Sequence, residues 1–190
     1  ADTISPVSVY LKIRDQFPNS ILLESSDYHG NDNSFSYICC NQIASIKVEA
    51  KLITKTYPDH TTETKTVEPN KVTLEIDTFT KQFKTKNDKV FKFINNGMFG
   101  FTAYDAVKYF EDITISKKED SIEIPDIYYA VYQNIIAINH FKNEAYIFAH
   151  CYECESNIEA IDHLIKIQSF SSYDFKSKGE ISSNLTDKAF

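Results

Sequence analysis

Two of the four glycines in this chain lie within one dense stretch, residues 97–111, with the sequence GMFGFTAYDAVKYFE. The apolar residues around Gly97 and Gly100 predict a short buried strand, in which a missing side chain lets another backbone come close. From Ala103 onward, apolar residues recur at helical spacing, and Asp105 falls where a helix dipole favours a carboxylate. The stretch therefore predicts a strand that passes directly into a helix as part of the core.

Strand and helix patterns alternate along the rest of the chain. Ser5 before Pro6 predicts a capped helix start, and Asn157 is predicted to cap the last helix. Together the patterns predict an α+β fold, mostly antiparallel two-layer β structure with three or four peripheral helices. The predicted strands are 21–25, 35–40, 43–57, 61–67, 127–138 and 145–149, and the predicted helices are 6–17, 70–86 and 158–168.

Charge and hydrophobicity exclude two classes of partner. A formal net charge of -7 provides no basic surface for phosphate backbones, so no nucleic acid is expected as a partner. No apolar run is long enough to span a bilayer, so no membrane association is expected either. Hydrophobic content of 42% indicates a globular chain, which we expect to be cytoplasmic.

The four cysteines form two pairs with different expectations. Cys39 and Cys40 are adjacent on a predicted strand, so their side chains should point to opposite faces. Cys151 and Cys154 have a C-x-x-C spacing and are flanked by His150 and His163, so two thiolates and two imidazoles could form a zinc site. Structural zinc sites usually contain a second closely spaced ligand pair, which is missing, so we expect reduced, metal-free thiols.

The stretch 97–111 resembles the G-x-x-G-Y-x-x-Y-D-x-V-R-x-F-E segment in the amino-terminal half of anthranilate synthase component I. Phe101 stands in place of a tyrosine and Lys108 in place of an arginine, which keeps the charge but not the planar fork. Other segments resemble this family in the same order along the chain. They are 21–25 (L-L-E-S), 34–39 (R-Y-S-F-I-G), 124–142 (P-D and D-H-x-x-N) and 179–190, which is similar to the family's linker.

This resemblance implies a specific reaction for the full-length enzyme. Chorismate and ammonia, delivered by a glutamine amidotransferase subunit, would give anthranilate and pyruvate with Mg2+. The family's residues for chorismate and Mg2+ lie in the half that follows, so no catalytic or metal residue is assigned here and no cofactor is expected in this fragment. Residues 1–168 would form the amino-terminal regulatory domain. Residues 169–190 would be a linker into an absent catalytic domain.

The resemblance also implies a role for four residues in feedback inhibition by tryptophan. It places Leu23, Glu24 and Ser25 at the inhibitor, with Ser36 nearby. A carboxylate can hold the ammonium group of an amino acid, a hydroxyl can orient it, and apolar walls can take an indole ring.

Several alternatives remain at this point. Glu24 could pair with a lysine and Ser25 could cap a turn, without any ligand. Aminodeoxychorismate and isochorismate synthases share this half of the family. A stand-alone module that binds an amino acid or another protein is an alternative from a different class.

Overall fold

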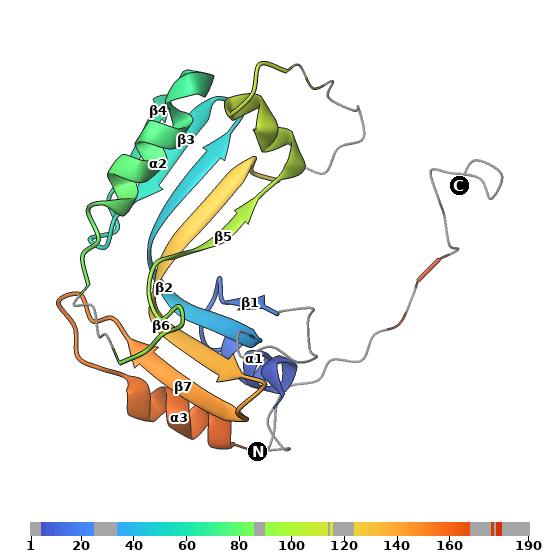
Figure 1. Ribbon diagram of the computed structural model, residues 1–190, viewed down its shortest axis with the longest axis vertical. Coiled ribbons are helices and arrows are strands. Elements are labelled where there is room, and N and C mark those ends of the chain that lie inside the picture. The colour runs from blue at the N-terminus through green and yellow to red at the C-terminus, as the bar shows by residue number, and fades with distance from the viewer. Residues whose placement is uncertain are drawn as a thin grey trace.

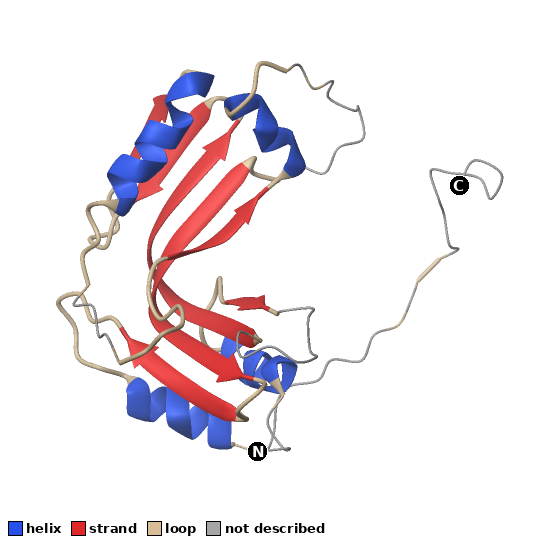
Figure 2. Cartoon of the chain, in the orientation of Figure 1, coloured by secondary structure: helices blue, strands red, loops and turns tan. Residues whose placement is uncertain are grey.

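The computed structural model describes residues 5–24, 34–85, 90–113, 115, 124–167, 176, 178 and 179. Within these residues, seven strands form one antiparallel sheet with helices on its outer side (Figures 1 and 2), so the predicted α+β class is confirmed. The strands are β1 (Ile21–Leu23), β2 (Phe35–Glu49), β3 (Leu52–Thr56), β4 (Thr62–Thr66), β5 (Met98–Thr102), β6 (Ile127–Asn139) and β7 (Glu144–Ala149). The helices are α1 (Pro6–Arg14), α2 (Val72–Thr80) and α3 (Ile158–Lys166), with 3-10 turns η1 (Pro69–Lys71) and η2 (Tyr104–Tyr109).

The long strands β2 and β6 form the centre of the sheet, which is bent into a C shape (Figure 1). At the bend, Gln42 pairs with Tyr132 while Ala44 pairs with Val131, so Ile43 is one extra residue in β2. Such a bulge bends a strand and increases its twist. It divides the sheet into two arms, an upper arm with β3, β4 and β5 and a lower arm with β1 and β7.

Each arm has its own hydrophobic core on the outer side. In the upper arm the core lies under α2, where Val72 and Phe79 pack against Ile46, Val48 and Ile53. The lower arm packs against α1 and α3 through a second cluster. Its fully or almost fully buried members include Val9, Ile13, Ile38, Ile136 and Ile161. The helices thus cover the convex face of both arms (Figure 1).

A third cluster lines the inside of the curve near the bend. The cluster connects β2, β5 and β6. It contains Cys39 of β2, Phe99 of β5, and Tyr132 and Ile135 of β6. Cys40 belongs instead to the cluster under α1, which confirms that the adjacent cysteines face opposite sides of β2.

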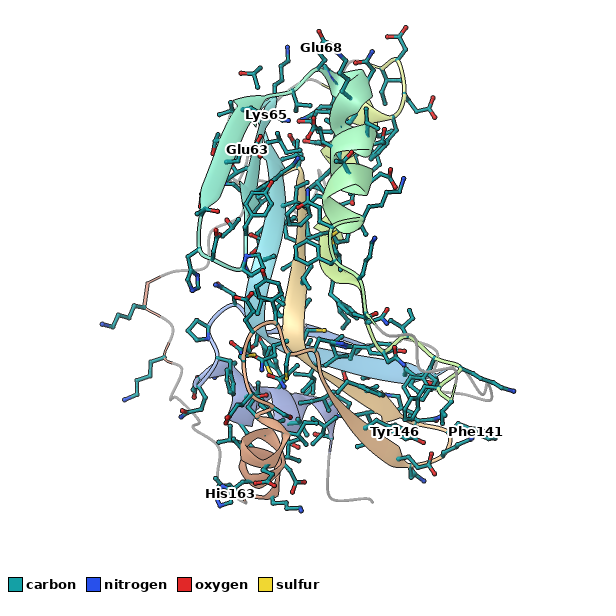
Figure 3. All side chains as sticks on the ribbon, turned by 90° about the vertical axis from the view of Figure 1, so that its left-hand side faces the viewer. Glu63, Lys65, Glu68, Phe141, Tyr146 and His163 are labelled. Atoms are coloured by element: carbon teal, nitrogen blue, oxygen red, sulfur yellow. The ribbon has the colours of Figure 1, made fainter. Side chains whose placement is uncertain are left out.

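A buried ion pair fastens α2 to the sheet. The ammonium group of Lys55 on β3 is almost fully buried and lies 2.7 Å from a carboxylate oxygen of Glu75 on α2. The other oxygen of Glu75 lies 3.0 Å from Lys65 on β4, which is seen beside Glu63 in Figure 3. Hydrogen bonds from Lys55 and then Lys65 lower the pKa of Glu75, so this carboxylate is ionised at neutral pH.

One strand prediction was wrong at a turn without the usual signals. Residues 43–57 were expected to form one strand, but β2 and β3 meet in a tight turn at Ala50 and Lys51. Both residues have left-handed backbones, with φ of 48° and 67°. Glycine or asparagine usually occupies such positions, so nothing in the sequence marked this turn.

The stretch 97–111 contains the predicted strand, but β5 is an edge strand rather than a central one. Gly100 meets the predicted need, because a Cβ there would lie 2.0 Å from the carbonyl oxygen of Tyr128. Gly97 is needed for a different reason. A Cβ there would have no atom within 4 Å, but the φ of 128° is one that other residues rarely adopt. The predicted helix after Ala103 is the 3-10 turn η2.

Both predicted caps are tested by the structure. The Ser5 side chain accepts a hydrogen bond from the backbone N–H of Ser8, so the start of α1 is confirmed. Asn157 makes no capping bond at α3. Its amide instead exchanges two hydrogen bonds, of 2.7 and 3.0 Å, with the buried amide of Asn134 on β6.

Two further observations concern the predicted linker and membrane-spanning helices. Apart from residues 176, 178 and 179, the predicted linker 169–190 lies outside the described residues. None of the helices in the described ranges is long and apolar enough to cross a membrane.

Candidate functional site

The predicted inhibitor segment begins where β1 ends. β1 pairs with β2 so that Leu22 lies opposite Ile38 and Leu23 lies opposite Tyr37. Leu23 is the last paired residue, is 37% exposed, and is followed by the exposed Glu24. The strand was expected to be buried, yet it is only partly covered because it lies at an edge of the sheet. Ser25 lies outside the described residues.

Ser36 occupies a different environment from Leu23 and Glu24. Its side chain is fully buried, and its hydroxyl lies 2.7 Å from Nε2 of His140. The backbone N–H of His140 donates to the carbonyl of Ser34 at 3.0 Å. These contacts join the start of β2 to the turn between β6 and β7. Ser36 directly precedes Tyr37 in the chain, but its hydroxyl is bonded to His140 in the protein interior.

An aromatic surface lies beside Leu23 on the inside of the curve. The ring of Tyr37 is 6.0 Å from Phe35 and 6.1 Å from Phe99. Phe35 stacks in turn on Phe93 at 4.8 Å. Burial raises the pKa of the Tyr37 hydroxyl, so this side chain is neutral at physiological pH.

The aromatic surface continues across the lower arm. Phe91 and Phe93 pack against Tyr146 and Phe148 of β7, with ring centroids 5.0 to 6.0 Å apart. Tyr146 is labelled on the lower arm in Figure 3. This surface was not predicted from the sequence. Its signals were pairs of alternating rings such as Phe91 and Phe93, and each pair alone is weak evidence for an extended segment.

The family-like residues of the upper arm form a structural cluster. Lys108 Nζ lies 2.7 Å from one oxygen of the Asp126 carboxylate, and the Tyr109 hydroxyl donates to the other at 2.6 Å. Burial alone would raise the pKa of Asp126, but the hydrogen bonds from Lys108 and Tyr109 hold it below its usual value. The cluster attaches η2 to the start of β6, and it leaves Asp126 without a free oxygen for a ligand.

One pocket among the described residues has a lining that does not include β1. It has a volume of about 860 Å³, and neither Leu23, Glu24 nor Ser36 lines it. Its walls come from the β3–β4 turn, the end of α2 and the segment after β7. Polar and apolar side chains are mixed in these walls, so size alone does not make it the inhibitor site.

Metal binding has no support in the described residues. All four cysteines are free thiols; Cys39 and Cys40 are buried, and Cys151 and Cys154 are exposed. No group of three or more His, Cys, Asp or Glu side chains in the described ranges is arranged to hold a metal ion.

The chain is similar in sequence to curated proteins named anthranilate synthase component 1. It is 29% identical over 156 residues to anthranilate synthase component 1 of Lactococcus lactis subsp. lactis (strain IL1403). This alignment covers 78% of this chain and 30% of the relative. It is 27% identical over 145 residues to anthranilate synthase component 1 of Pseudomonas putida, which covers 76% of this chain and 29% of the relative. The chain thus spans less than a third of the length of these curated relatives.

A crystal structure of anthranilate synthase component I from Streptococcus pneumoniae TIGR4 has a TM-score of 0.48 and 21% identity, covering 87% of this chain and 34% of that chain. No family model matches the sequence. For the stretch that this chain covers, the two curated sequence relatives confirm the predicted resemblance to anthranilate synthase component I.

Proposed function

We propose that this chain is the amino-terminal part of an anthranilate synthase component I and contributes to the site where tryptophan inhibits that enzyme. The observation that carries the proposal is the similarity to two curated relatives of that name over more than three quarters of the chain. The residues at the end of β1 supply the chemistry that an amino-acid inhibitor needs.

Within this proposal, Glu24 and Leu23 have separate tasks. The exposed carboxylate of Glu24 holds the ammonium group of tryptophan. Leu23 and the neighbouring ring of Tyr37 offer apolar surface to the indole. Ser25 completes the segment by orienting the ligand through its hydroxyl.

Ser36 acts indirectly in this proposal. Because its hydroxyl is bonded to His140, it holds the start of β2 in place rather than contacting the ligand. The position of Tyr37, the next residue, depends on that attachment.

The remaining parts of the reaction belong to the intact enzyme. Chorismate and Mg2+ would be bound by the catalytic half, and a glutamine amidotransferase subunit would supply ammonia. Because the proposal places the chorismate and Mg2+ residues in the catalytic half, the fragment alone is expected to be inactive.

The test uses a full-length enzyme that contains this chain. Tryptophan should inhibit anthranilate formation, and Ser25→Phe should abolish inhibition while leaving basal turnover largely intact. Glu68→Gln, at an exposed glutamate of the upper arm, is a surface control that should leave inhibition unchanged. Unchanged inhibition in a folded, active Ser25→Phe enzyme would show that this segment is not the regulatory site. Formation of aminodeoxychorismate or isochorismate instead of anthranilate would identify a related enzyme.

A further inference from the structure

The loop between β7 and α3 brings two thiols together. Cys151 and Cys154 are both exposed and are separated by only two residues. Between them, Glu153 has a left-handed backbone with φ of 50°, and the chain bends at this point. The two-residue spacing and the bend at residues 152–154 keep the two thiols on one short turn. Partial desolvation and then the neighbouring Cys154 raise the pKa of the Cys151 thiol.

Both ends of this loop are attached to β6. The backbone N–H of His150 donates to the carbonyl of Gln133 at 2.7 Å, and the Gln133 side chain donates to the carbonyl of Glu155 at 3.4 Å. Beyond the loop, Asn157 is held by its paired hydrogen bonds with Asn134. The loop is therefore confined before any bond forms between its two sulfur atoms.

We propose that Cys151 and Cys154 form a reversible intramolecular disulfide by exchange with a small-molecule disulfide such as oxidised glutathione. One cysteine thiolate attacks a glutathione sulfur, forms a mixed disulfide and displaces one glutathione thiolate. The second cysteine thiolate then attacks the protein sulfur and displaces the other glutathione. Two protein thiols are oxidised, one glutathione disulfide is reduced to two thiols, and the two protons pass to the departing thiolates.

The other cysteine pair is a control within the same chain. Cys39 and Cys40 are buried, and their side chains belong to clusters on opposite faces of β2. Burial raises the pKa of Cys40 to about 12, which leaves almost no thiolate at neutral pH. These two thiols should remain reduced wherever the protein is folded.

The disulfide would act on the pocket of about 860 Å³ described above. Cys151 and Tyr152 are among its lining residues, together with Tyr57 and Phe83. Oxidation would fix this part of the lining in one conformation, and reduction would free it. This inference does not depend on the proposed tryptophan site, since that pocket does not include Leu23 or Glu24.

The experiment places the purified chain in glutathione buffers of graded redox potential. Free thiols are then alkylated, and trypsin is used to release the peptide 143–166, which contains both Cys151 and Cys154. We expect this peptide to change from a doubly alkylated form to an unalkylated form lacking two hydrogen atoms, while Cys39 and Cys40 become alkylated only after denaturation. Oxidation that gives only separate glutathione adducts on the two cysteines would overturn the proposal, and so would a zinc ion held by the two thiols.

Two variants of Glu153 test the turn itself while leaving both thiols present. Glu153→Gly accepts a positive φ and should form the disulfide as readily as the parent chain. Glu153→Pro excludes that backbone and should lower the ratio of disulfide to dithiol about tenfold at a given potential. Circular dichroism confirms that both variants are folded. Equal oxidation of the proline variant and the parent would show that this turn does not bring the thiols together.

Discussion

The hydroxyl of Ser36 and Nε2 of His140 lie 2.7 Å apart, although 104 residues separate them in the sequence. Each belongs to a segment that resembles anthranilate synthase component I, one at the start of β2 and the other after β6. The contact links these two segments physically. It also separates the role of Ser36 from that of the exposed Glu24.

The first prediction concerns the energy of this contact. Ser36→Ala and His140→Ala should each destabilise the chain, and a double-mutant cycle should give a coupling energy of about 1 kcal/mol. Urea unfolding followed by circular dichroism measures all four proteins. Additive effects of the two substitutions would mean that the contact contributes no coupling energy.

A second prediction compares Ser36 with Glu24 in tryptophan inhibition. In a full-length enzyme, Glu24→Gln should raise the tryptophan concentration for half-inhibition more than Ser36→Ala does, because the first removes a charge partner of the ligand. Ser36→Ala should change inhibition only through the position of β2. The assignment of Glu24 fails if its substitution has the smaller effect.

Tryptophan binding to this chain alone can be measured separately. The chain contains no Trp, so emission excited beyond tyrosine absorption comes from the ligand. If the proposed function is right, binding should be weak, because this chain spans less than a third of its curated relatives and a ligand beside the exposed Glu24 would be only partly desolvated.

The third prediction concerns the buried Lys55–Glu75 pair. Glu75→Gln should cost about 3–5 kcal/mol of unfolding free energy, because it leaves the buried Lys55 without its carboxylate. The double variant Lys55→Met with Glu75→Leu should recover most of that loss. Asp77→Asn is the control on the same helix. Asp77 pairs with Lys81 at the surface, so its substitution should cost about 0–1 kcal/mol.

Both substitutions in that double variant replace polar groups by apolar side chains of similar length. If the double variant is as unstable as Glu75→Gln alone, packing at this point rather than the unpaired charge limits stability. Denaturant midpoints and slopes for the four proteins distinguish these outcomes.

The fourth prediction concerns acid stability. The pKa of Asp126 is lower in the folded chain than in the unfolded chain, so its contribution is present above the unfolded value of about 3.9 and is lost as pH falls through the folded value. Asp126→Asn should therefore reduce the loss of stability below about pH 4. Lys108→Met should move that loss to higher pH, because the cation that holds the pKa down is gone. An unchanged acid dependence in both variants would contradict this assignment.

The fifth prediction separates the two glycines of the stretch 97–111. Gly100→Ala should detach β5 or shift it, since its Cβ would lie 2.0 Å from the Tyr128 carbonyl oxygen, and should cost about 3 kcal/mol or more. Gly97→Ala should cost about 1–3 kcal/mol through backbone strain alone. Urea unfolding of both variants gives the order. Equal costs would show that β5 can move away from β6 without penalty.

Most helices and strands could be predicted because their signals are local. The Ser5–Pro6 start of α1 and the mostly apolar run of β6 each depend on neighbouring residues only. The turn at Ala50 and Lys51 could not be predicted, because its geometry is imposed by the pairing of β2 with β3 rather than by the turn residues.

The candidate site was predictable only as far as the family resemblance reaches. Leu23 and Glu24 follow from a short segment, and their exposure follows from the edge position of β1. The burial of Ser36 against His140 required the pairing of distant strands. Asn157 shows the same limit, because its amide is used by Asn134 instead of the helix end.

The pairing of β2 with β6 also has a consequence for how the chain assembles over time. The β2–β6 register runs from Val48 opposite Ile127 to Phe35 opposite Asn139, so even its shortest contact closes a loop of about 79 residues (127 − 48). Hairpins such as β6–β7 are local and form quickly, whereas contacts of high sequence separation are slow because loop entropy is lost before they are stable. We therefore expect refolding to be slow, with the pairing of β2 and β6 as its rate-limiting step. Until then, both long strands present unpaired edges, and the refolding chain is most exposed to aggregation at that stage.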